Sequence, residues 1–194
     1  MQLQVVDGRT VRREKSRQRI VEAIVQIVTE GEVEPTAVNV AEIAGVTMRT
    51  VFRHFDDMES LLREVVLDLR VQTDALRVEF NPDEDWREQF EQLILRRTDL
   101  FERFMPRLVW ASAARHKSPV INEDLQSYSK RLRQSLERML PDQFVANVDA
   151  FSAVEAVLSW DFWIRLRRDQ KLSVKGSIKV VQTAVTAILK DAGH

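Results

Sequence analysis

The stretch Gly45–Phe55, GVTMRTVFRHF, has the spacing of a short helix with two opposed faces. At 100° per residue, Val51, Phe52 and Phe55 fall within an arc of about 100°, so we expect them to be buried. The opposite side carries polar and basic side chains: Arg49, Thr50, Arg53 and His54. A helix of roughly two turns is unstable alone in water, so neighbouring helices must support it. The stretch therefore predicts a small helical domain that presents arginines outward.

The residues before this helix complete a helix-turn-helix. A helix is predicted over 39–45, where Asn39 and Glu42 have the spacing of a capping box, and Gly45 allows the sharp turn. A first helix is predicted over 11–30, with an apolar stripe formed by Ile20, Ile24, Ile27 and Val28. The inward side chains of the two short helices would pack on this stripe: Val40, Ile43, Ala44, Val46, Val51 and Phe55.

The rest of the chain consists of further helical segments separated by prolines and glycines. Asp56 and Glu59 repeat the capping spacing, and Asn81-Pro82 and Ser173 have the form of helix starts. The expected helices are 57–79, 82–105, 107–115, 119–140, 143–168 and 173–190. No strand pattern is found. The sequence predicts an all-α fold of about nine helices, with a three-helix helix-turn-helix domain over 1–56 and a helical body over 57–194.

Composition excludes several classes of protein. Hydrophobic residues make up 44% and charged residues 30%, as in soluble globular proteins. The chain has no cysteine, which rules out disulfides and thiolate nucleophiles. No apolar run reaches the roughly 20 residues of a membrane span, and the first residues have no signal-peptide pattern. We therefore expect a cytoplasmic protein.

Catalytic patterns are not found in the sequence. The three histidines, His54, His116 and His194, are far apart, and no group has metal-ligand spacing. The sequence has neither a glycine-rich phosphate loop nor a nucleophile elbow. We accordingly expect no enzyme activity, no cofactor and no metal.

Charge is unevenly distributed. The net charge is −1, yet residues 1–21 hold six basic and two acidic side chains, a net +4. A helix with outward arginines suits the DNA major groove, about 12 Å wide, because the planar guanidinium matches two acceptors on guanine. The basic N-terminal segment and His54 would then lie near phosphates.

Two runs of residues resemble the DNA-binding domain of the TetR (tetracycline-repressor-like) family of transcriptional regulators: Val40–Thr47 and Val51–Leu62. The resemblance extends over about residues 10–65. It implies a homodimeric, usually repressing, DNA-binding regulator whose C-terminal body binds a small molecule. It also implies that the last two long helices of each subunit pair into a four-helix bundle.

The resemblance places the base-contacting positions on Thr47, Met48, Arg49, Thr50 and Arg53. Candidate phosphate contacts are Arg12, Arg13, Arg17, Asn39 and His54. The sequence departs from the family at Ala37, Phe52 and Met58, where the family often has Thr, Tyr and Lys that can contact phosphate. Loss of phosphate contacts weakens binding to all sequences without altering base preference.

The body is rich in aromatic residues, which are core residues in most helices and line apolar pockets in some. The candidate pocket residues are Trp86, Phe90, Phe101, Phe104, Trp110, Phe151, Trp160 and Trp163. They indicate an apolar or aromatic small molecule. The wide apolar faces of the last two helices give candidate dimer contacts: Phe151, Val154, Val157, Leu158, Val181, Val185 and Ile188.

The expected function is therefore a sequence-specific transcriptional regulator, a repressor released from a palindromic operator by a small molecule. One alternative is a helical ligand-binding or adaptor protein with weak DNA binding, motivated by Ala37, Phe52 and Met58. An all-α enzyme ranks last. The sequence does not identify the ligand or the operator. It also does not decide whether DNA binding represses or activates transcription, or whether the body has a ligand pocket at all.

Overall fold

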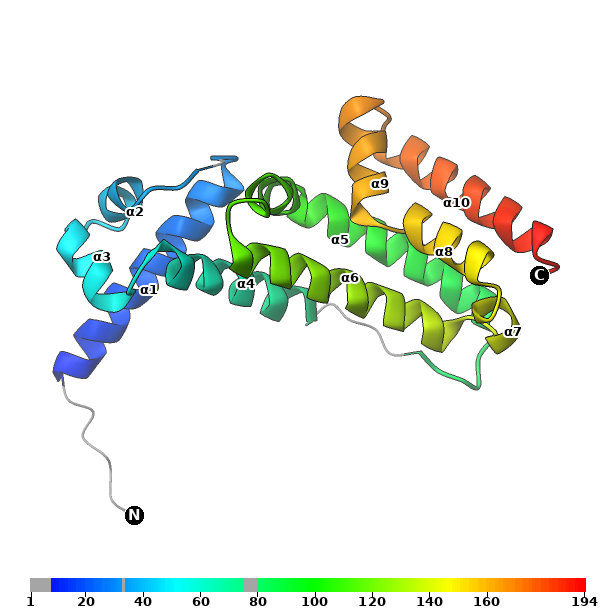
Figure 1. Cartoon of the computed structure of the whole chain (residues 1–194), viewed down its shortest axis with the longest axis horizontal. Coiled ribbons are helices and arrows are strands. Elements are labelled where there is room, and N and C mark those ends of the chain that lie inside the picture. Colours follow the sequence, from blue (N-terminus) through cyan, green and yellow to red (C-terminus); the bar gives the residue numbers. More distant parts are fainter. Residues whose placement is uncertain (1–7, 33, 75–79) are drawn as a thin grey trace, which may run out of the picture. The chain divides into compact units, whose positions relative to one another are not determined.

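The computed structural model describes residues 8–32, 34–74 and 80–194. These residues form ten α-helices and one π-helical segment, with no strand among them (Figure 1). The all-α prediction is confirmed. The helices are α1 (Gly8–Thr29), α2 (Ala37–Ile43), α3 (Met48–His54), α4 (Met58–Asp74), α5 (Trp86–Ala114), α6 (Pro119–Met139), α7 (Asp142–Val145), α8 (Val148–Val157), α9 (Trp160–Ile164) and α10 (Val174–Asp191), with the π-helical segment η1 at Arg165–Asp169.

The chain divides into two compact units. Unit 1 comprises Met1–Ala75 and Val109–Asp124, and unit 2 comprises Leu76–Leu108 and Leu125–His194. Helices α1 to α4 therefore lie in unit 1, together with the end of α5 and the start of α6. The functional boundary at residue 56 stays a prediction.

The core of unit 1 forms around α1, which packs against α2, α3 and α4. Its predicted stripe is buried: Ile20, Ile24, Ile27 and Val28. Gly45 follows α2 with a φ of +63°, a conformation that favours glycine and turns the chain into α3. Ile43 is exposed, contrary to expectation, because Val40, Ala41 and Ala44 already form the buried side of α2.

Several helices begin at residues other than those expected. Thr36, rather than Asn39, caps α2, and Asp57, rather than Asp56, accepts a hydrogen bond from the Ser60 amide at the start of α4. Helix α5 begins at Trp86 instead of Pro82, because the Asp85 carboxylate accepts from the Arg87 amide. The cap at Ser173 is confirmed. Residues 75–79 of the helix expected over 57–79 lie outside the described residues.

Two predicted helix boundaries in the C-terminal part are wrong. Helix α5 continues through Pro106, because its buried stripe continues on both sides of the proline, at Phe104 and Leu108. The single helix expected over 143–168 is instead divided into α7, α8, α9 and η1. Asn147 and Ser159 cause two of these breaks, since each side chain accepts a hydrogen bond from an amide at the start of the next helix.

The core of unit 2 is built from α5, α6, α8, α9 and α10 around large buried side chains, among them Phe101, Phe151 and Trp163. The Glu102 carboxylate of α5 accepts hydrogen bonds from Trp163 Nε1 at 2.8 Å and Arg167 Nε at 2.7 Å. This carboxylate therefore fixes α9 and η1 on α5. Among the described helices, none combines the length and apolar character that a membrane crossing requires.

Candidate nucleic-acid interface

Helix α3 is short and is held at both ends. Thr47 caps it, because the threonine hydroxyl accepts from the Thr50 amide at 3.2 Å, and the two threonine hydroxyls share a hydrogen bond of 3.0 Å. Val51 and Phe55 anchor the inward side, since both are buried. The guanidinium of Arg17 on α1 lies 5.3 Å from the Phe55 ring centroid. These contacts fix the orientation of α3 on α1.

The outward side of α3 presents two cations and two large apolar side chains. Arg49 and Arg53 are exposed, as predicted. Met48 and Phe52 are 45% and 46% exposed. The expectation that Phe52 is buried is wrong, because Val51 and Phe55, four residues apart, already occupy the inward side. Met48 and Phe52 have the same four-residue spacing, so they form an apolar strip beside the arginines.

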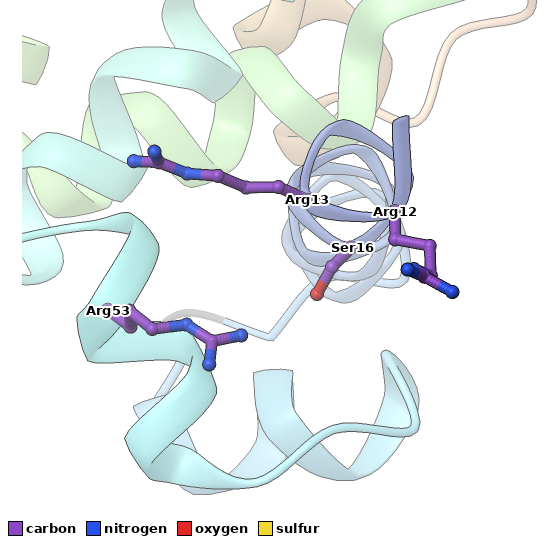
Figure 2. Close-up of a pocket in the computed structure, with 4 residues that line it drawn as sticks. All are labelled: Arg12, Arg13, Ser16 and Arg53. Carbon is purple, nitrogen blue, oxygen red and sulfur yellow. The ribbon is translucent and has the colours of Figure 1, made fainter. Parts of the chain in front are cut away.

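A basic concavity of about 450 Å³ lies between α1 and α3, lined by Arg12, Arg13, Ser16 and Arg53. In Figure 2 the Arg53 side chain extends from α3 toward α1, and the Ser16 hydroxyl faces the same gap. Arg12 and Arg13 project to different sides of α1 in that view. We call these four residues the basic concavity. Its lining supplies three cations and one hydroxyl, groups that bind phosphate oxygens.

Ser16 is the member of the basic concavity that the sequence reasoning missed. It lies four residues after Arg12 on a helix, so the i, i+4 rule places the two side chains on one face. Applied to the basic N-terminal segment, that rule would have identified Ser16.

Two predicted phosphate contacts have partners inside unit 1, and their contact with DNA stays a prediction. Arg17 forms an ion pair with Glu64 of α4 at 2.7 Å, in addition to its contact with Phe55. Arg17 is thus a packing residue that joins α1, α3 and α4. The Asn39 side-chain oxygen accepts a hydrogen bond from the hydroxyl of Thr36, the capping residue of α2, at 3.0 Å.

His54 is a half-buried group with a weakened affinity for protons. Burial lowers its pKa below 6.5, and the positive charges of Arg53, Arg13 and Arg17 lower it further. Its Nε2 atom is buried and has no hydrogen-bond partner among the described residues. Both effects favour the neutral ring in the free chain, and contact of His54 with phosphate stays a prediction.

Acidification should destabilise the protein through His54. Between its lowered pKa and 6.5, the unfolded chain binds a proton at this residue and the folded chain does not. The free energy of unfolding therefore rises with pH through that window and falls as the pH falls. Urea denaturation of the parent and the His54→Gln variant over about pH 5–8 measures this effect. We expect a weaker pH dependence in the variant, and an unchanged one would contradict the assigned environment.

The candidate residues of the helical body are mostly core residues. Seven of the eight candidate pocket aromatics are buried and Trp86 is half-buried, while Trp110 belongs to unit 1. A pocket lined by them stays a prediction. Five candidate dimer residues are buried within the single chain and pack its core: Phe151, Val154, Leu158, Val181 and Val185. Val157 and Ile188 are half-buried.

Comparison with known proteins identifies the fold. A TetR transcriptional regulator from Rhodococcus sp. RHA1 aligns with 92% of this chain and 99% of its own, with a TM-score of 0.54 and 20% sequence identity. No family model matches the sequence, and neither does any curated protein. The chain therefore has the fold of this regulator, which agrees with the resemblance of the helix-turn-helix residues.

Proposed function

We propose that this chain is a sequence-specific DNA-binding transcriptional regulator, a repressor released from its operator by a small molecule. The observation that carries the proposal is the outward side of α3 beside the basic concavity. Arg49 and Arg53 are exposed on a helix whose other side is anchored by Val51 and Phe55. A helix supported in this way can enter the major groove while its neighbours contact the backbone.

The exposed side chains of α3 can contact two kinds of base, guanine and thymine. Arg49 offers a guanidinium fork for guanine O6 and N7. The exposed Met48 and Phe52 offer apolar contact for the methyl group of thymine. We therefore expect a half-site in which guanine lies next to thymine.

The basic concavity suits the DNA backbone on one flank of α3. Its arginines on α1 and α3 can approach one phosphate from two elements. This supports strong phosphate contact despite Ala37, Phe52 and Met58. The adaptor alternative rests on these three positions and predicts weak binding to any duplex.

A dimer follows from the proposed reading of DNA, because one short helix reads few base pairs. Two half-sites about 34–36 Å apart would provide the affinity and specificity of a regulator. We propose that α8 and α10 form the dimer contact. Exposed apolar residues on them support this, among them Val148 at 67% and Val180 at 37% exposure.

Release by a ligand requires a connection between the body and α3, and unit 1 contains a contact suited to it. The Glu59 carboxylate on α4 accepts from the Ser118 hydroxyl at 2.9 Å and from the Val120 amide at 3.3 Å. Glu59 thus holds the start of α6, a helix with residues in both units. We propose that a ligand shifts α6, and with it α4 and α3. By linkage, operator binding then weakens ligand binding by the same factor.

The salt dependence of binding to a random duplex tests the DNA-binding part of the proposal, namely that the basic concavity contacts phosphates. For each phosphate neutralised, the slope of log K against log salt steepens by about 0.9. We expect Arg13→Gln and Arg53→Gln each to flatten the slope by about that amount. The control is Arg138→Gln, an exposed arginine of α6 in unit 2. A flat slope for the parent protein would favour the adaptor alternative.

A further inference from the structure

Unit 2 contains a buried cation in an apolar face. Arg97 lies on α5 with only 6% of its surface exposed. Its neighbours along the same side of the helix are buried apolar residues: Phe90, Ile94, Phe101 and Phe104. Arginine is almost never buried to this degree unless its charge is paired.

The partners of Arg97 do not neutralise it. Its Nη2 atom donates to the Leu132 carbonyl at 2.6 Å and to the Ser135 hydroxyl at 2.5 Å, and its Nε atom has no partner among the described residues. No carboxylate of the described residues forms an ion pair with it. Tyr128 and Glu155 both favour the charged form of Arg97 electrostatically, but neither is its ion-pair partner, and the Glu155 carboxylate is paired with Arg133. Burial lowers the pKa of Arg97 to about 10, so the guanidinium remains charged at neutral pH.

The contacts that Arg97 does make are not required by the fold. The Ser135 hydroxyl also donates to the Leu132 carbonyl, at 2.8 Å. Both acceptors therefore keep a partner in the absence of the arginine. A buried unpaired charge is costly, and its replacement by an apolar side chain of similar size is often neutral or stabilising. The acceptors on α6 therefore do not by themselves require an arginine at this position.

We propose that Arg97 is the anchor for the carboxylate group of an apolar small molecule that binds in unit 2. The planar guanidinium fork binds a carboxylate through two parallel hydrogen bonds, and the pairing is strongest where water is excluded. The buried apolar side chains beside Arg97 on α5 match the apolar remainder of the molecule in chemistry. A phosphate monoester fits less well, because its second charge and its hydration would be lost among phenylalanines.

This inference rests on the proposed function in one respect: the carboxylate that it describes would be the effector of the proposed regulator. Its test uses no DNA, so the two can fail separately. Loss of DNA binding in the salt experiment leaves the carboxylate site unaffected, and a protein without a carboxylate site can still bind DNA.

The test compares carboxylates with neutral molecules of the same shape on the full chain. The probes are decanoate, phenylacetate and 2-naphthoate, each paired with its primary amide, and the readouts are thermal unfolding and calorimetric titration. The variants are Arg97→Met, which removes the charge, and Arg97→Lys, which keeps the charge and loses the fork. Arg138→Met is the surface control.

We expect at least one carboxylate to raise the Tm of the parent protein well beyond its amide, as binding to the folded state alone requires. Arg97→Met should bind that carboxylate at least tenfold more weakly, and Arg97→Lys should show an intermediate loss. Without any probe, Arg97→Met should unfold at the same or a higher temperature than the parent. The inference is overturned if no carboxylate stabilises more than its amide. It is also overturned if probe-free Arg97→Met is clearly less stable, because Arg97 would then be a structural contact between α5 and α6.

Discussion

Replacing Arg49 with alanine is expected to remove most of the protein's preference for its operator over random DNA. A bidentate contact to guanine contributes about 1–3 kcal/mol of discrimination, so two half-sites of a dimer lose about 2–6 kcal/mol. Arg49 is exposed and lies opposite the buried Val51 side of α3, so the fold should be unaffected. Equilibrium binding to the selected operator and to a scrambled duplex, at equal salt, gives the two affinities.

The Arg49→Lys variant is the matched control, because lysine keeps the charge but cannot form the bidentate contact. It should bind the scrambled duplex as the parent does and lose affinity for the operator. If Arg49→Ala weakens operator and scrambled DNA equally, Arg49 contacts only phosphate and another residue reads the bases.

The largest expected effect on stability is that of Trp163→Ala. Trp163 is 1% exposed and fills the core of unit 2, and a buried tryptophan truncated to alanine costs about 3–5 kcal/mol. The loss includes the hydrogen bond from its indole to Glu102, which would then keep only its Arg167 partner. Urea denaturation measures the difference in unfolding free energy. A fall well below 1 kcal/mol would contradict the packing described for Trp163.

Two controls separate volume from hydrogen bonding. Trp163→Phe retains most of the aromatic volume and removes only the indole donor, so a smaller loss is expected. Trp86→Ala changes a half-buried tryptophan on α5 and should cost less than Trp163→Ala.

The parts of the fold that follow from local patterns could be predicted from the sequence. The α1 stripe, the turn at Gly45 and the cap at Ser173 are all set by residues within a few positions of one another. Pro106 predicts a helix end that the structure does not have, because buried residues on both sides keep α5 helical through the proline. The breaks at Asn147 and Ser159 were missed for the opposite reason, since a single polar side chain redirected an otherwise helical segment.

The candidate site was predictable only in part for a related reason. Arg49 and Arg53 follow from the periodicity of α3, but a helix of two turns leaves the face of Phe52 ambiguous. The ion pair of Arg17 with Glu64 joins residues far apart in sequence, so no local spacing indicates it. The burial of Arg97 likewise depends on the packing of α6 against α5.

The central claim is that α3 reads a DNA sequence as part of a dimer, and selection from a random duplex library tests it most directly. The library is incubated with the full chain at about 0.15 M salt, where nonspecific contacts are already weakened. We expect enrichment of a palindrome whose half-sites lie about one helical turn apart and contain guanine next to thymine. Recovery of only random sequences, at a protein concentration where a control repressor selects its operator, would contradict the claim and leave the adaptor alternative.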